Sequence, residues 1–221
     1  MRMRPSVRKL ALTAHVTASL GWAGALAVFF AHSVAGLTSD DQQIVRAATL
    51  VMGITAWFVI LPLALASLTT GLVQALGTSW GLLRHYWILF KLTLTAIATT
   101  VLLLKLGPIS YLTEAAAKAT FSSADLSGLR MSVMAHAGGG LLVLLTIAAL
   151  AVYKPRGLTA YGARRVRAQD GAKSGSARTE VASLPRWVKI FGALLALFIL
   201  MVGLMSSFGS HGPSAHAPAH G

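Results

Sequence analysis

The chain has 221 residues, of which 55% are hydrophobic and only 11% are charged, and it contains no cysteine. A soluble domain usually carries about 25% charged residues, so this composition indicates a membrane protein. The absence of cysteine excludes disulfides, thiolate chemistry, iron–sulfur clusters and covalently attached c-type haem. Any metal or haem must therefore be bound by histidine, methionine, lysine, tyrosine or carboxylate side chains.

Five apolar blocks reach about 20 residues, the length that crosses about 30 Å of hydrocarbon at 1.5 Å per residue. They cover residues 10–36, 46–76, 86–106, 131–153 and 187–208. Backbone groups in lipid must be hydrogen-bonded within their own segment, so each block is expected to be a helix. The blocks do not alternate as the strands of a transmembrane barrel do. The sequence therefore predicts an all-α, multi-pass transmembrane protein.

The first block is preceded by basic residues, as a signal peptide is, but its apolar run is longer than the 7–15 residues or so of a secretory signal. We therefore expect it to be retained as the first transmembrane helix. Residues 1–158 would hold four spans and residues 187–208 the fifth. Residues 159–186 are expected to form a basic cytoplasmic linker, and residues 209–221 a disordered tail rich in histidine and proline.

The basic residues predict the orientation of the chain in the membrane. Fifteen lysines and arginines and two acidic residues lie on the side that carries the N-terminus, the 77–85 loop with Lys91, and the 154–186 loop with its edges. The other side has four basic and four acidic residues, namely Arg46, Lys105, Lys118 and Arg130 with Asp40, Asp41, Glu114 and Asp125. The positive-inside rule places the N-terminus in the cytoplasm and the C-terminus outside the bacterial cytoplasmic (inner) membrane.

The basic linker has two interpretations. Its charges can simply fix the topology while solvated, or they can bind anionic lipid head groups or nucleic acid. We prefer the first interpretation, keep anionic lipids as a possible partner, and expect no nucleic acid.

Four of the seven histidines lie within or at the edge of the apolar blocks, namely His15, His32, His85 and His136. An ionisable side chain in a membrane is costly and marks a functional site by default. The alternative is that each imidazole only bonds to a hydroxyl or carbonyl group of a neighbouring helix. His32 and His136 lie at a similar depth in the outer half, where two facing imidazoles can hold a b-type haem. His15 groups with Lys91, and with His85, towards the cytoplasm.

Two glycine-rich helix faces adjoin these histidines. Trp22 follows His15 by seven residues and shares its helix face, among small residues that permit close helix packing or leave room for a flat macrocycle. Gly138–Gly140 follow His136 and predict very close contact with another helix or with a flat ligand. Pro62 is expected to kink the second helix.

The tail offers a separate candidate metal site. His211, His216 and His220 can bind a divalent metal outside the cell, although their spacing matches no defined site.

Three short motifs resemble a known membrane superfamily. They are His15 followed by Trp22-Ala23-Gly24, then Leu68-Thr69-Thr70-Gly71, and then Tyr86-Trp87-Ile88-Leu89-Phe90-Lys91. This pattern resembles the copper-resistance protein D-like superfamily, which includes HemJ-type protoporphyrinogen oxidases. The chain is also similar to a bacterial integral-membrane family with no assigned function, marked by the run His136-Ala137-Gly138-Gly139-Gly140.

The resemblance covers roughly residues 7–158. It implies an antiparallel four-helix bundle with an appended fifth helix, and haem b or copper as the cofactor. It also implies that His15 is a haem or metal ligand and that Lys91 is a nearby cation, suited to a haem propionate. The chain departs from the oxidases after Trp22-Ala23-Gly24, where it lacks their polar and basic residues.

Three functions follow from these observations. The first is a haem-b-binding protein with a redox-related role and a membrane redox partner. The second is copper or other cation handling or uptake, and the third is a structural or accessory membrane subunit, in a homo-oligomer or a larger complex. None of the six acidic residues lies inside a predicted span, which argues against hydrolysis by paired carboxylates. The sequence has no glycine-rich loop followed by Lys-Ser/Thr, the motif that would predict nucleotide binding. Whether the protein is an enzyme stays open.

Overall fold

A computed structural model describes residues 3–77, 83, 85–118, 126–155, 157–164 and 185–190, and single positions up to residue 200. Its main elements are α1 (Pro5–Thr38), α2 (Gln42–Thr55), the π-helical turn η1 (Ala56–Ile60), α3 (Leu61–Gly77), α4 (Tyr86–Ala117) and α5 (Ser127–Tyr153). The described residues form no strand beyond one isolated bridge between His85 and Leu158. The expected all-α fold is confirmed for this part of the chain.

In the described part of the chain, four helical segments are long and apolar enough to cross a membrane: α1, the continuous segment Gln42–Gly77 formed by α2, η1 and α3, then α4 and α5. Each presents a large, strongly exposed apolar side chain to its surroundings, for example Leu20, Phe58, Leu104 and Leu142, which are 67–78% exposed. Side chains of this kind spread along every helix suit contact with lipid rather than water. The segments thus indicate a membrane protein.

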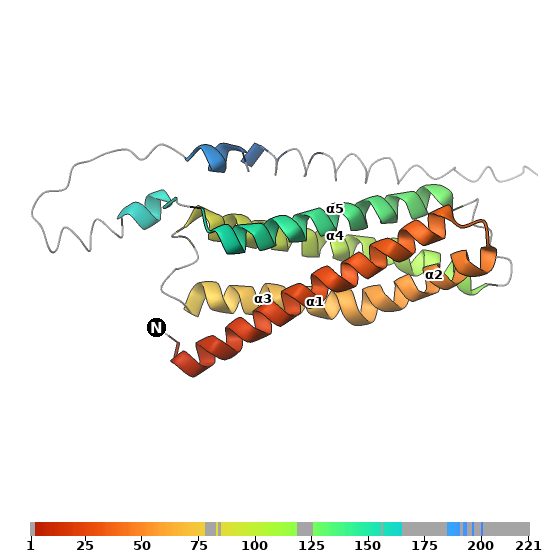
Figure 1. The fold of residues 1–221 in the computed structure, drawn as a ribbon, viewed down its shortest axis with the longest axis horizontal. Coiled ribbons are helices and arrows are strands. Elements are labelled where there is room, and N and C mark those ends of the chain that lie inside the picture. The colour runs from red at the N-terminus through yellow and green to blue at the C-terminus, as the bar shows by residue number, and fades with distance from the viewer. Residues whose placement is uncertain are drawn as a thin grey trace, which may run out of the picture.

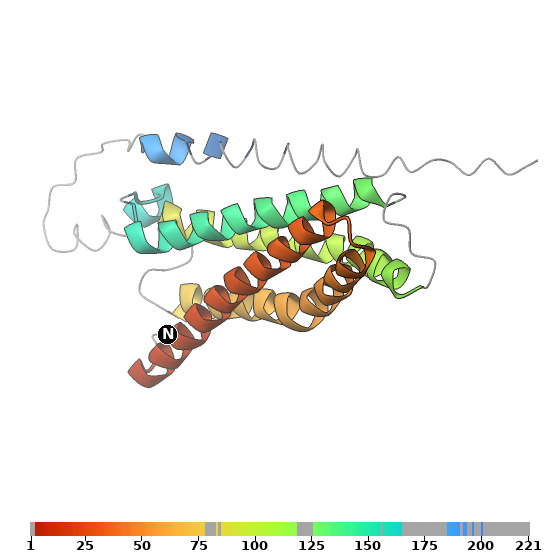
Figure 2. The ribbon, with the colours of Figure 1, turned by 45° about the vertical axis from the view of Figure 1, so that its right-hand side comes forward.

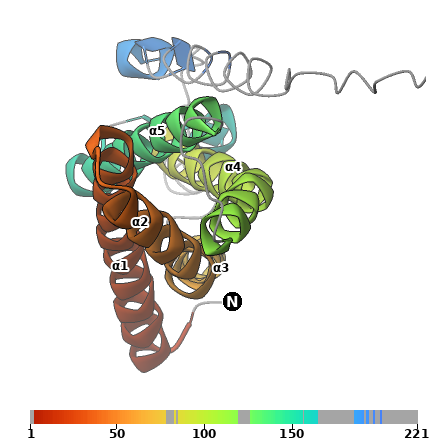
Figure 3. The same ribbon diagram turned by 90° about the vertical axis from the view of Figure 1, so that its right-hand side faces the viewer.

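The four segments form an antiparallel bundle (Figure 1). Helix α1 packs against the α2–α3 segment and against α5, while α4 closes the ring by packing against the same two neighbours. The view along the bundle shows the segments arranged around a common centre (Figure 3). The N-terminus and the end of α5 lie at one end of the bundle. Most of the predicted fifth span (187–208) and most of the 159–186 linker fall outside the described residues, as does the whole tail (209–221).

The second segment bends at η1 (Figure 2). Pro62 has no N–H group, so it cannot bond to the carbonyl of Phe58 four residues earlier. Ahead of it, the N–H of Leu61 bonds to the carbonyl of Ala56, five residues back, which is the π-helical pattern. The predicted kink near Pro62 is therefore built as a π turn. The turn places Ala56 and Ile60 in the bundle interior, where they are 0% and 1% exposed.

Helix α4 extends beyond the predicted third span. The sequence places the end of that span at residue 106, before Gly107 and Pro108, yet the helix continues through Pro108 to Ala117. Its last turns stay helical because Ile109, Leu112 and Ala116 are buried against the other segments. Arg46 of α2 adds to this by donating from Nη2 to the carbonyl of Ala117, 2.9 Å away, at the helix end where carbonyls lack intrahelical partners. Because of this extension, Lys105 lies near the middle of α4 rather than at its end.

Candidate functional site

The structure contains two histidine centres, and the first is formed by His15 on α1 and the end of α3. His15 Nδ1 lies 3.1 Å from the carbonyl oxygen of Ser67 and 3.2 Å from Thr70 Oγ1. A carbonyl oxygen only accepts, so the bond to Ser67 requires the proton of the neutral ring on Nδ1. Nε2 then carries the lone pair. A Cβ atom built on Gly71 would lie 3.0 Å from His15 Cε1, so the glycine makes room for the ring.

The Leu68–Gly71 motif and the preceding Ser67 therefore form the contact surface for the His15 imidazole. Ser67 makes a second contact with α1, because its hydroxyl lies 2.8 Å from that of Ser19, one turn further along α1. The sequence separates these motifs by more than fifty residues, and the packing of α1 on α3 joins them.

Lys91 and His85 were predicted to lie with His15 towards the cytoplasm. Lys91 Nζ lies 5.9 Å from the ring centroid of Trp87. The His85 ring, two residues before Trp87 in the chain, lies 6.3 Å from the Trp87 ring between centroids. Lys91 and His85 thus both adjoin Trp87 at the start of α4.

The second centre is His136 on α5. Its Nδ1 lies 2.7 Å from the carbonyl oxygen of Ser132, one turn earlier on the same helix. By the same reasoning the proton is on Nδ1 and the lone pair on Nε2. His136 Nε2 is buried and has no hydrogen-bond partner among the described residues. A buried polar atom without a partner requires an explanation.

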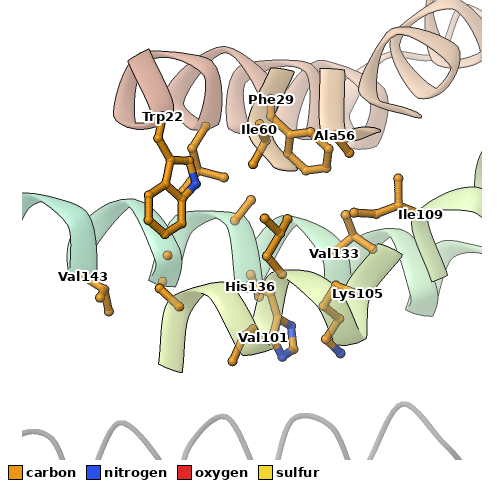
Figure 4. Close-up of a pocket in the computed structure, with 17 residues that line it drawn as sticks. Trp22, Phe29, Ala56, Ile60, Val101, Lys105, Ile109, Val133, His136 and Val143 are labelled. Carbon is orange, nitrogen blue, oxygen red and sulfur yellow. The ribbon is translucent and has the colours of Figure 1, made fainter. Parts of the chain in front are cut away.

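His136 lines a cavity of about 70 Å³ between the four segments, on the side opposite Trp22, Phe29 and Ile60 (Figure 4). All four segments contribute to it: Trp22, Leu26 and Phe29 from α1, Ala56 and Ile60 from η1, Val101, Lys105 and Ile109 from α4, and Val133, Gly139 and Val143 from α5, among others. The π turn therefore shapes one wall. Apart from His136 and Lys105, the walls are apolar or aromatic.

The three consecutive glycines of α5, Gly138–Gly140, face α1 and the cavity. A Cβ atom on Gly138 would lie 3.0 Å from the Phe30 ring, and one on Gly140 would lie 3.2 Å from the Leu26 side chain. Gly138 and Gly140 thus let α5 approach α1 closely, and Gly139 and Gly140 line the cavity. Close helix contact, one of the two predicted explanations for this run, is present.

Lys105 is the residue that sequence reasoning missed. It was expected at the outer edge of the third span, among the charges of the outer side. Because α4 continues to Ala117, Lys105 lies near the middle of the helix and lines the cavity. The signal in the sequence is that residues 92–113 contain no charge other than Lys105.

The other predicted site residues lie elsewhere. His32 Nδ1 bonds to the carbonyl of Val28 on its own helix, 2.8 Å away, and His32 does not line the His136 cavity. The expected outer pair is thus not assembled around this cavity. Trp22, expected beside His15, lines the cavity of His136 instead. His211, His216 and His220 fall outside the described residues.

The cavity at His136 does not suit haem b, whereas the residues around His15 would. Pockets for ligands of that size are about 300 Å³ or larger, and the cavity of about 70 Å³ presents one imidazole and no second histidine. The residues there do not fit a haem. At the first centre, His15 presents an oriented Nε2, which would suit a ligand to the iron of a haem, and Lys91 is the cation that would pair with a propionate. Among the described residues no group of three or more His, Cys, Asp or Glu side chains is placed to hold a metal ion.

Comparisons with protein families, with curated proteins and with solved structures found no match to this chain. The function is therefore inferred from the geometry of the two histidine centres.

Proposed function

We propose that this chain is a multi-pass protein of the bacterial cytoplasmic membrane that binds haem b through His15 and has a redox-related role. One observation carries the proposal: His15 Nδ1 donates to the Ser67 carbonyl of another helix, 3.1 Å away. Histidines that bind metals are commonly oriented by such a bond from their second nitrogen. The resemblance to the copper-resistance D-like superfamily points to the same residue.

The residues around His15 have distinct tasks in this proposal. Ser67 fixes the tautomer and direction of the imidazole, Gly71 makes room for it, and Lys91 supplies a positive charge for a propionate. Haem b, when bound, supplies one-electron chemistry. The protein supplies one ligand, a nearby charge and an apolar surrounding, which together tune such a group.

Copper handling is the weaker proposal. Copper sites combine several histidine or methionine ligands, and the described residues gather no such group of histidines and acidic side chains. The tail histidines would have to supply the site. A role as an accessory subunit, with the imidazoles serving only to fasten helices, is the outcome if no cofactor is bound.

The orientation and lipid contacts are also proposed. The N-terminus, the start of α4 and the end of α5 lie at the same end of the bundle (Figure 1). The described basic residues near these points are Arg4, Arg8, Lys9, Lys154 and Arg164. Charge gathered at one end favours the cytoplasmic side and suits anionic head groups there.

An absorption spectrum of the full chain tests the proposal. The protein is expressed with adequate haem, purified in detergent, and measured oxidised and reduced. We expect a Soret band that His15→Ala abolishes or shifts. His32→Ala is the matched control, because the imidazole of His32 bonds to the Val28 carbonyl of its own helix, and it should leave the band unchanged. No Soret band in the wild type, or an unchanged band in a monodisperse His15→Ala protein, would rule out haem at this residue. Copper content with and without residues 209–221 tests the weaker proposal.

A further inference from the structure

We propose that the central cavity binds the carboxyl group of an acid, with Lys105 pairing with the carboxyl oxygen and His136 Nε2 receiving its proton. This site is separate from the His15 centre and does not depend on haem binding there. The amphiphilic acids of the bilayer, such as fatty acids, are the source that the position of the cavity favours. A small free carboxylate would share the same chemistry.

The first step is the depth of the two polar groups. Lys105 lies about 5 Å beyond the midpoint of α4 (Tyr86–Ala117), at 1.5 Å per residue. His136 lies about 6 Å before the midpoint of α5 (Ser127–Tyr153). Since the helices are antiparallel, both displacements are towards the same end of the bundle, and the two side chains share one level near its centre. Figure 4 shows their nitrogen-bearing ends on the same side of the cavity.

The second step is the charge of Lys105. An ammonium group near the centre of a membrane segment is costly and normally pairs with an anion. Every described residue that lines the cavity other than Lys105 is uncharged or, for His136, an imidazole, and none is a carboxylate. A bound anion would supply the missing partner. A bound metal cation would be repelled by Lys105.

The third step is the lone pair of His136. Because Nδ1 donates to the Ser132 carbonyl, the buried Nε2 can only accept. The cavity thus offers one donor cation and one acceptor at the same level. A carboxylic acid matches both: its O–H group donates to Nε2 and its carbonyl oxygen accepts from Lys105. If the proton transfers, the O–H bond breaks, an Nε2–H bond forms, and the carboxylate lies between two cations.

The fourth step is size. A cavity needs about 10–15 Å³ to hold one water molecule, so a cavity of about 70 Å³ accommodates a carboxyl group and its first methylene groups. Trp22, Phe29 and Ile60 form apolar walls for the start of an acyl chain. The rest of a long chain must extend out of the cavity between the helices.

The test is equilibrium binding of radiolabelled laurate to the purified full chain in nanodiscs of zwitterionic lipid. Specific binding is defined by displacement with unlabelled laurate. We expect no displacement by 1-dodecanol, which has the same chain without the acid. Lys105→Met should weaken laurate binding by at least about tenfold, as loss of a charged hydrogen-bond partner does. Lys118→Met, at the exposed end of α4, should bind laurate like the wild type.

Two further arms complete the experiment. His136→Leu should weaken binding, while His32→Leu, outside the cavity, should not. Acetate that displaces laurate at equal concentration would identify a free carboxylate as the source and still support the site. Displacement by 1-dodecanol as effective as by laurate, or a Lys105→Met protein that binds like the wild type, would overturn the proposal. Should Lys105→Met not fold, the laurate and 1-dodecanol comparison in the wild type decides alone. None of these readouts depends on haem.

Discussion

The imidazole of His15 and the main chain of Ser67 join two helices that are far apart in sequence, through a 3.1 Å bond from Nδ1 to the carbonyl oxygen. The same serine is buried, and its hydroxyl meets the hydroxyl of Ser19 at 2.8 Å. Ser67 thus contacts α1 with its carbonyl and its hydroxyl group. This double contact fixes the register of α1 on α3 and, with it, the direction of His15 Nε2.

Gly71→Ala should disturb this contact. The new Cβ would lie 3.0 Å from His15 Cε1, closer than atoms normally pack, so the ring must move and weaken its bond to Ser67. Crowding of this kind costs about 1–3 kcal/mol, and any haem spectrum should shift as well. Thermal unfolding in detergent measures the loss. Gly24→Ala is the matched control, because nothing lies within 4 Å of that position. Equal melting temperatures for the two variants would show that Gly71 and the His15 ring are not tightly packed.

The helices could be predicted from the sequence because hydropathy and length are local properties. Each of the first four apolar blocks falls within a helical segment, and Pro62 marked the bend. The end of α4 could not be predicted in the same way. Gly107 and Pro108 are typical of a helix end, but the tertiary burial of Ile109 and Leu112 maintains the helix past them. Because the third span was predicted to end at residue 106, Lys105 was assigned to its outer edge and was not predicted to line the cavity.

The grouping of the histidines likewise depends on tertiary contacts that the sequence does not predict. Counting residues along α1 placed Trp22 on the face of His15, yet seven residues are about 10 Å of helix, enough for the two side chains to serve different centres. Depth alone suggested that His32 faces His136. Which way each ring turns depends on bonds that the sequence does not reveal, such as that from His32 to its own Val28 carbonyl.

Gly53→Ala should destabilise the contact between α2 and α4. A Cβ atom at this position would collide with the side chain of Thr113, so we expect a loss of about 1–3 kcal/mol. Adding Thr113→Ala removes the hydroxyl and methyl groups that meet the new atom and should restore most of the stability. Gly107→Ala, with open space around it, serves as the control on α4. The prediction fails if the double variant unfolds at the same temperature as Gly53→Ala.

Trp57 and Ser110 form a polar pair on the outer surface of the bundle. Trp57 lies on η1 and is 45% exposed, and its Nε1 donates to Ser110 Oγ at 3.0 Å. In lipid this N–H group has no water to bond with. A double-mutant cycle with Trp57→Phe and Ser110→Ala should give a coupling energy of about 0.6 kcal/mol, the average for hydrogen bonds between membrane helices. Additive single effects would mean that the pair contributes nothing to stability.

The absence of cysteine makes the topology directly testable, since any introduced cysteine is unique in the chain. Ser6 and Asp40 are exposed and lie at opposite ends of α1, and Ser214 lies in the tail beyond the predicted fifth span. With a cytoplasmic N-terminus and five spans, a membrane-impermeant maleimide should label Asp40→Cys and Ser214→Cys in spheroplasts, but Ser6→Cys only after membrane disruption. Labelling of Ser6→Cys in intact spheroplasts would reverse the orientation derived from charge. Labelling of Asp40→Cys without Ser214→Cys would show that residues 187–208 do not cross the membrane, and the basic linker and the tail would then lie on the same side.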